Sequence, residues 1–250
     1  MAIDSGLYKQ AAEYILDSKR SCAFTGAGIS VESGIPTFRG ENGLWNKYDP
    51  GFLDISYFQS NAQKSWKLIK EVFYDYFGKA VPNSAHNALA WLEAGNYLQS
   101  IITQNIDNLH QEAGSANVIE YHGTSHELVC TGCNSRYVAE ESLLKSLPPM
   151  CKNCGSVLKP DFVFFGEPIP DTANQKALRE AEVADLFILI GTTGEIMPAS
   201  MIPYQAKQNG AKIIEINITP SNYTNSITDI YLEGRATDVL GSLLDIIKRV

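Results

Sequence analysis

The sequence has no apolar run long enough to cross a bilayer. None of its apolar stretches approaches the roughly 20 residues that a transmembrane helix needs. Residues 1–10 also lack the basic start, apolar stretch and small-residue cleavage site of a signal peptide. These absences predict a soluble, cytoplasmic protein without a membrane partner.

Basic residues are scarce relative to acidic ones. The 250 residues include 20 Lys and Arg against 28 Asp and Glu, so the formal net charge is −8. A surface that binds nucleic acid needs clustered Lys and Arg, so we expect no nucleic-acid partner. The acidic field favours basic peptide segments instead.

Cysteine is also scarce, yet four of the five cysteines form two C-x-x-C pairs. The pairs are Cys130/Cys133 and Cys151/Cys154, and the linker between them lets both close on one metal. Zn²⁺ takes four thiolates tetrahedrally, which leaves no coordination position for water or substrate. The pattern therefore predicts one structural zinc and places the chemistry elsewhere. The alternative is two disulfides, which the reducing conditions inside a cell disfavour.

Apolar strands alternate with helical patterns along most of the chain. The expected strands are Ser21–Thr25, Ser100–Thr103, Asp185–Ile190 and Lys212–Ile216. The expected helices are 8–20, 84–94, 172–184, 198–209 and 239–250. The last two strands are nearly continuous apolar runs, as in parallel strands buried on both faces. The alternation predicts an α/β fold with a doubly wound, Rossmann-like parallel sheet and a ligand crevice at the carboxyl ends of its strands.

Two segments interrupt this alternation and predict a second, smaller domain. Residues 41–80 are rich in aromatic side chains and are expected to form a helical insert beside the crevice. Residues 126–158 hold the cysteine pairs and are expected to form an inserted zinc-binding module. The Rossmann-like domain would then comprise 1–40, 81–125 and 159–250.

A glycine-rich turn, Gly26-Ala27-Gly28, follows the first strand. Glycines at this place let the backbone approach a phosphate, and the N-terminus of the next helix attracts negative charge. The dinucleotide-binding fingerprint has a third glycine three residues further on, where this chain has Val31. The turn alone is compatible with a phosphate site or with an ordinary strand-to-helix connection.

A series of motifs in fixed order runs from this turn almost to the end of the chain. It comprises SGIPTFRG (33–40), TQNIDNLH (103–110), His122-Gly123, the two cysteine pairs, KPDFVFFGE (159–167), Gly191-Thr-Thr193 and Asn217-Ile-Thr219. The series resembles the sirtuin family of NAD-dependent protein-lysine deacylases. The resemblance implies an enzyme that uses NAD as co-substrate, binds one structural Zn²⁺ and acts on an acyl-lysine protein or peptide. We expect a compact monomer.

The resemblance also implies how the reaction proceeds. The acyl-lysine carbonyl oxygen attacks the anomeric carbon of the nicotinamide ribose as nicotinamide leaves. Asn105 and Asp107 would hold the ribose, with Gln104 in contact. His122 would then act as general base on a ribose hydroxyl, which attacks the alkylimidate carbon; an imidazole suits this because its pKa lies near neutrality. The implied products are free lysine, nicotinamide and O-acyl-ADP-ribose.

Binding residues follow from the same resemblance. The residues expected to contact NAD are Gly26, Ala27, Gly28, Ser30, Phe38, Arg39, Gln104, Asn105, Ile106, Asp107, Gly191, Thr192, Thr193, Asn217, Ile218, Thr219 and Ala236. The residues expected to pair with the peptide as an added strand are Val163, Phe164, Phe165 and Gly166. We interpret His86 and His110 as structural residues.

Thr37 replaces the Asp that many sirtuins carry in this motif. At Thr37 and Gly194 the chain resembles one branch of the family, whose members include enzymes that remove acidic acyl groups such as succinyl. Those enzymes bind the distal carboxylate with a Tyr and an Arg three residues apart on a helix. Counting from Trp66 places these positions at Ile69 and Val72, and no Tyr-x-x-Arg occurs in 60–80. An unpaired carboxylate is costly to bury, so a neutral acyl group is predicted.

Two other functions remain open. One is protein ADP-ribosyl transfer, in which an amino-acid nucleophile intercepts the ribosyl group. The other is a non-catalytic module that binds NAD or ADP-ribose. The His122-Gly123 pair favours deacylation over transfer to an amino acid. Asn105, Asp107 and His122 together argue against a pure binding module, which needs no proton acceptor there.

Overall fold

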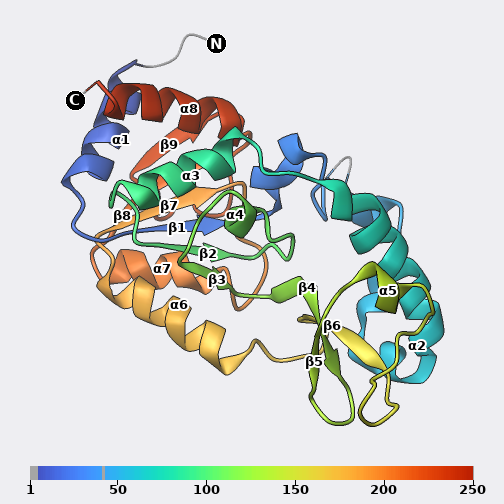
Figure 1. The fold of residues 1–250 in the computed structure, drawn as a ribbon. Coiled ribbons are helices and arrows are strands. Elements are labelled where there is room, and N and C mark those ends of the chain that lie inside the picture. The colour runs from blue at the N-terminus through green and yellow to red at the C-terminus, as the bar shows by residue number, and fades with distance from the viewer. Residues whose placement is uncertain (1–4, 41–42, 250) are drawn as a thin grey trace.

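The structure is a computed structural model that describes residues 5–40 and 43–249. It has two lobes, a larger one built on a sheet with helices on both faces and a smaller one with its own short sheet (Figure 1). Residues 1–4 of the predicted Rossmann-like domain and residues 41–42 of the predicted helical insert lie outside the described residues. Residue 250, the predicted end of the last helix, also lies outside them.

The sheet of the large lobe has six strands in the order β3-β2-β1-β7-β8-β9, and all its pairings are parallel. The strands are β1 (Ser21–Thr25), β2 (Ser100–Thr103), β3 (Val118–Glu120), β7 (Leu186–Ile190), β8 (Lys212–Asn217) and β9 (Ile230–Glu233). The order reverses between β1 and β7, and such a switch point opens a crevice at the carboxyl ends of the strands. The predicted doubly wound α/β fold is confirmed.

Successive side chains of the central strands point to opposite faces, and each face is covered by helices (Figure 1). Ala23 and Ile188 pack in one core, against α1 (Ser5–Asp17), α3 (Ser84–Ala94) and α8 (Ala236–Ile247). Phe24 and Phe187 pack in the other core, against α6 (Asp171–Val183) and α7 (Met201–Gln208). A strand buried on both faces must be apolar along its whole length, which explains why β1 and β7 were visible in the sequence.

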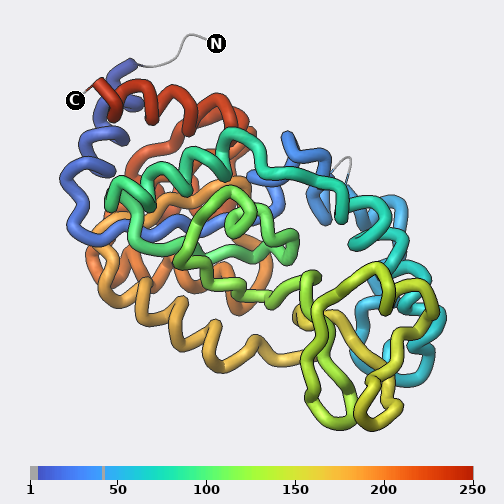
Figure 2. The backbone as a smooth tube through the Cα atoms, in the orientation of Figure 1, coloured from blue at the N-terminus to red at the C-terminus, as the bar shows by residue number. Residues whose placement is uncertain are grey.

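The small lobe combines both predicted inserts. Its antiparallel sheet has the order β5-β4-β6. The elements are β4 (Gly123–Cys130), β5 (Arg136–Val138), α5 (Glu141–Leu144), β6 (Leu158–Phe162), α2 (Ile55–Ile69), the π-helix η4 (Lys70–Tyr76) and the 3₁₀ turns η2 (Leu44–Asn46), η3 (Pro50–Leu53) and η5 (Phe77–Lys79). Trp66 of α2 is fully buried and donates its indole N–H to the Leu158 carbonyl at 2.7 Å. One core therefore joins the inserts, although the chain returns to the large lobe between them (Figure 2).

Element ends differ from the sequence predictions by a few residues. The small sheet begins at Gly123 and ends at Phe162, outside the predicted limits of 126 and 158. Helix α3 is capped by Asn83, whose side chain accepts the backbone N–H of Ala85 at 2.9 Å, while His86 Nδ1 accepts the Asn83 N–H at 3.3 Å. This reciprocal capping box satisfies N–H groups that a helix leaves unpaired at its start. In the described residues, no helix combines the length and the apolar character that a membrane crossing requires.

Candidate active site

The main cleft lies between the two lobes, at the carboxyl ends of the central strands, and has a volume of about 660 Å³. Its walls come from the loop after β1, the loop after β2, the loop after β7 and the segment after β6. The predicted residues that line it are Gly26, Ala27, Gly28, Phe38, Arg39, Gln104, Asn105, Ile106, His122, Val163, Phe164, Phe165, Gly166, Gly191, Thr192 and Thr193. The fold thus brings six separate segments of the chain to one crevice large enough for a sizeable ligand.

A second cavity of about 630 Å³ lies against the first. The two share Ala27, Phe38, Phe73, Asn105 and Ile106 in their walls. Two further predicted NAD contacts, Ser30 and Asp107, lie in this second cavity. The remaining four, Asn217, Ile218, Thr219 and Ala236, line neither cavity.

The glycines after β1 are required by close packing between two loops. The Gly28 N–H donates to the Gly191 carbonyl at 2.9 Å, and a Cβ on Gly28 would lie 2.5 Å from Gly191 Cα. A Cβ on Gly26 would lie 2.8 Å from the same carbonyl oxygen, and Gly191 itself has a φ of +61°. Any side chain at these positions would push the loops after β1 and β7 apart. The glycine pattern therefore sets the shape of the cleft, a reason that differs from the phosphate approach expected from sequence.

Ser30, Asn105 and Asp107 meet at the boundary of the two cavities. The Ser30 hydroxyl donates to Asp107 Oδ2 at 2.7 Å, and Asn105 Nδ2 donates to Ser30 Oγ at 3.2 Å. Asp107 Oδ1 also accepts the backbone N–H of Leu109 at 3.1 Å. Asn105 is buried, with 6% of its surface exposed. These bonds fix an amide and a carboxylate side by side at the end of β2.

His122 lies just before β4, in the wall of the main cleft. Its Nδ1 lies 3.0 Å from the Gln104 carbonyl oxygen. A carbonyl can only accept, so Nδ1 carries the proton and Nε2 keeps its lone pair. Burial lowers the pKa of His122 below its ordinary value, against the opposing effect of the Gln104 carbonyl. The ring is therefore neutral at physiological pH and presents a proton acceptor at Nε2.

Gln104 connects three of the loops that form the cleft. Its carbonyl orients His122, its backbone N–H donates to the Thr25 carbonyl at 2.9 Å, and its side-chain amide donates to Thr192 Oγ1 at 3.0 Å. Asn217 supports the same loop, because its side-chain amide donates to the Thr192 carbonyl at 3.0 Å. The residues after β1, β2 and β7 are thus held in one network.

His86 and His110 lie beneath this site in the protein interior. Both are buried, and burial lowers the pKa of His86 to about 4 and that of His110 to about 3. His110 Nε2 lies 3.0 Å from the hydroxyl of Thr25, and His86 Nε2 lies 3.4 Å from the hydroxyl of Ser30. The contact of His86 with the Ser30 network was not foreseen from sequence, because 56 residues separate the two.

The segment predicted to take the peptide already uses several of its backbone groups. The Val163 N–H donates to the His122 carbonyl at 2.9 Å. The Phe165 N–H donates to the Leu53 carbonyl at 2.9 Å, and its carbonyl accepts the Ile55 N–H at 3.0 Å. A peptide strand added here would therefore pair with the groups that remain, chiefly those of Gly166.

Other residues that line the cleft were not among the site residues predicted from the sequence. They are Thr37, Trp45, Leu53, Phe73, Phe162, Glu167, Pro168, Ile169, Asn174, Ile196, Met197 and Pro198. The sequence indicated that the aromatic-rich segment 41–80 lies beside the crevice, but it did not single out Trp45 or Phe73. Met197 is 64% exposed in a loop, and no sequence motif marks the segment 196–198.

The positions expected to face an acyl chain, Ile69 and Val72, are in the core instead. They are 0% and 1% exposed and line neither cavity, so this alignment is wrong. Ile69 follows the fully buried Trp66 by three residues and so shares its core face, and the change from α to π at Lys70 affects only the later position, Val72. Within 70–79, the pairs three apart that line the second cavity are Lys70/Phe73, Tyr74/Phe77 and Asp75/Gly78.

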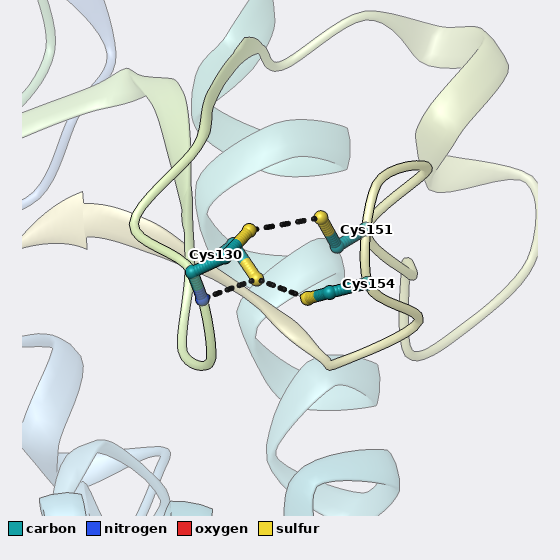
Figure 3. A group of neighbouring side chains, drawn as sticks. Cys130, Cys151 and Cys154 are labelled. Carbon is teal, nitrogen blue, oxygen red and sulfur yellow. Dashed lines mark hydrogen bonds between the residues drawn. The ribbon is translucent and has the colours of Figure 1, made fainter.

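The four cysteines of the two pairs converge in the small lobe, as predicted. Their sulfur atoms all lie within 4.8 Å of one another, and no other such group of His, Cys, Asp or Glu occurs in residues 5–40 and 43–249. Figure 3 shows Cys130, Cys151 and Cys154 pointing toward a common centre. Cys130 and Cys154 Sγ are 3.4 Å apart, too far for a disulfide bond of about 2.05 Å. Zn–S bonds of about 2.3 Å place tetrahedral sulfurs about 3.8 Å apart, so the cluster fits one structural zinc.

Comparison with known proteins gives consistent matches. The sequence model of the Sir2 family matches residues 26–198. The NAD-dependent protein deacetylase 1 of Pyrobaculum aerophilum is 45% identical, covering 94% of this chain and 93% of its own. A Sir2 homologue variant solved with ADP-ribose has a TM-score of 0.92 at 41% identity, covering 96% of each chain. A Sir2–p53 peptide–NAD⁺ complex has a TM-score of 0.89 at 32% identity, covering 97% of this chain and 99% of that one.

Proposed function

Because this chain belongs to the Sir2 family of NAD-dependent protein-lysine deacylases, we propose that His122, Asn105 and Asp107 form its catalytic centre. The chain is an enzyme that removes acetyl or other acyl groups from protein lysine, with NAD as co-substrate and one structural zinc. The products are free lysine, nicotinamide and O-acyl-ADP-ribose. The enzyme is also a transferase, since the acyl group passes from lysine to ADP-ribose.

The observation that carries this proposal is the orientation of His122. Its Nδ1–H is held by the Gln104 carbonyl at 3.0 Å, so Nε2 is the free base within the cleft. A general base works best when its pKa is low enough to leave it neutral and high enough to accept a proton. His122 would take the proton of a ribose hydroxyl through Nε2.

Asn105 and Asp107 would hold the nicotinamide end of NAD. Both side chains are fixed through Ser30, so they meet the ligand without reorganisation. When bound, NAD supplies the carbon to which the acyl oxygen becomes attached. Gly26–Gly28 and Gly191–Thr193 meet at the switch point of the sheet, the usual place for a dinucleotide. Asn217, Ile218, Thr219 and Ala236 would contact the adenosine end only at the margin of this crevice.

The test is mass spectrometry of an acetyl-lysine peptide incubated with the protein, with and without NAD. We expect loss of acetyl only with NAD, together with equal amounts of nicotinamide and O-acetyl-ADP-ribose. A protein acceptor that gains one ADP-ribose without loss of acetyl would instead identify an ADP-ribosyltransferase. NAD binding without turnover of any acyl peptide would indicate that the protein is a non-catalytic binding module.

The second cavity supports a preference for neutral acyl groups. None of the pairs three apart that line it within 70–79 is a Tyr followed by an Arg, and Tyr74 itself is followed by Phe77. Lys70 lines the same cavity, but its ammonium pairs with Asp75 at 2.6 Å. Lys79 also lines this cavity but is exposed, so a carboxylate on the acyl chain would lose water without gaining a buried cationic partner. We therefore expect acetyl-lysine peptide to be turned over at least about tenfold faster than succinyl-lysine peptide.

Matched peptides that differ only in the acyl group give this comparison as a ratio of kcat/KM. Equal or faster turnover of the succinyl peptide would contradict it. Lys79, which is exposed and lines the second cavity, would then be the residue to replace.

We further propose that the enzyme is cytoplasmic and monomeric. Four free thiols arranged to bind zinc are typical of a reducing compartment. The division into a Rossmann-like domain and a small domain of two inserts is supported by separate cores in the two lobes.

A further inference from the structure

Lys159 is a buried charge that the proposed chemistry does not use. It lies on β6, and only 8% of its side chain is exposed. Among the described residues it is the one buried lysine. A lysine is almost never fully buried unless it is paired, so its partners indicate what the charge does.

The partners of Lys159 all belong to the segment that follows it in the chain. Its ammonium donates to the carbonyl oxygens of Pro160 at 2.9 Å and Phe162 at 2.7 Å. It forms an ion pair with Glu167 Oε2 at 3.0 Å and lies 4.1 Å from the centre of the Phe164 ring. An ammonium has three donors, and these three acceptors use them all.

Glu167 connects the Lys159 ammonium to the turn that lines the cleft. Its Oε2 accepts the backbone N–H of Phe164 at 2.8 Å, and its own N–H donates to the Phe164 carbonyl at 3.0 Å. Gly166 sits at the tip of the turn with a φ of +88°. The turn 164–167 is thereby closed from both ends, and Phe164, Phe165, Gly166 and Glu167 all line the main cleft.

We propose that the ion pair between the buried Lys159 and the partly exposed Glu167 positions the turn 164–167 for the peptide, so that both are positioning residues for peptide affinity. The inference rests on the proposed function, in which this segment takes the peptide. Removing one partner of a buried pair leaves an uncompensated charge, whereas removing both is often tolerated. Without Lys159, Glu167 would turn to water and release the Phe164 N–H.

The experiment compares Lys159→Met, Glu167→Gln and the double variant. For Lys159→Met we expect the KM of an acetyl-lysine peptide to rise about 10- to 100-fold, as for other misplaced binding groups. The KM of NAD, and kcat with free N-acetyl-lysine amide, should change by less than about twofold, because neither depends on peptide flanks. The glutamine of the double variant can still accept the Phe164 N–H, so its peptide KM should fall back toward the wild-type value.

Lys207→Met is the matched control. Lys207 also forms an ion pair, with Asp229 at 2.6 Å, and Asp229 accepts the N–H of Ile213 near the amino end of β8. That end of the sheet is opposite the cleft, so this variant should keep both KM values. An unchanged peptide KM in Lys159→Met, equal rises in the KM of peptide and NAD, or additive effects in the double variant would each overturn the inference. If Lys159→Met does not fold, Glu167→Gln alone must raise the peptide KM for the inference to stand.

A separate measurement tests the segment itself. Adding peptide to the wild-type protein should shift the NMR amide resonance of Gly166. If that resonance does not move, the segment is not the peptide site and the inference falls with it. If the resonance moves but Lys159→Met keeps the wild-type peptide KM, only the role of the ion pair is wrong.

Discussion

Replacing His122 with alanine should lower kcat for deacetylation by about 10²- to 10⁴-fold, the usual contribution of a positioned general base. The dissociation constant for NAD should stay within about twofold of the wild type, because a lost base affects the chemical step and leaves uniform binding intact. Steady-state kinetics of the acetyl-lysine peptide and calorimetric titration with NAD measure the two quantities separately.

The pH dependence of kcat/KM, which reports the titrating groups of the free enzyme, provides the control for this assignment. The pKa of His122 lies below its ordinary value of 6.5 because the ring is buried. A base with a lowered pKa stays neutral as the pH falls, so the acidic limb of the wild-type profile should lie below pH 6.5. That limb should be missing from the residual activity of the alanine variant. Turnover at the wild-type rate in the variant would contradict the role of His122 as base. So would a variant that has lost both NAD binding and turnover.

Replacing Cys151 with serine should remove the zinc, unfold the small lobe and abolish turnover. Structural zinc contributes about 10–16 kcal/mol to the folding of zinc-finger peptides, while a whole domain is stable by only about 5–15 kcal/mol. Cys130 and Cys151 belong to the same core as Trp66, Phe162 and Phe164. Because Phe162 and Phe164 also line the cleft, loss of the metal should disturb the cleft as well as the small lobe.

Metal content by mass spectrometry and near-ultraviolet circular dichroism measure this loss directly. Cys22→Ala is the matched control, since Cys22 is equally buried but lies in β1, away from the cluster. It should keep about one zinc per chain and its activity. Full activity in a Cys151→Ser protein shown to be free of metal would contradict the structural role of the zinc.

The sequence alone determined much of the framework. β1 and β2 occupy their predicted residues, and α3 spans the predicted 84–94. Strands buried on both faces carry a continuous apolar pattern, and that signal depends only on neighbouring residues. The cysteine pairs predicted their cluster for a similar reason, because metal geometry restricts the spacing of ligands along the chain.

Helix faces near the cleft were less predictable. Counting from Trp66 at α-helical spacing led to Ile69 and Val72, which the structure places in the core. Ile69 shares the core face of the buried Trp66 three residues earlier, and only Val72 lies beyond Lys70, where the helix changes from α to π. Nothing in the local apolar pattern announces that change, because the packing of the small lobe stabilises it.

Only the tertiary structure decided how the site is assembled. The Lys159 ammonium meets Glu167 because the chain turns back beside β6. Ser30 joins Asp107 across 77 residues because β1 and β2 are neighbours in the sheet and end at the same edge. The sequence determined which side chains are present and which segments form strands. Which of them touch depends on the order of strands and the packing of loops, and these are set by contacts between residues far apart in the chain.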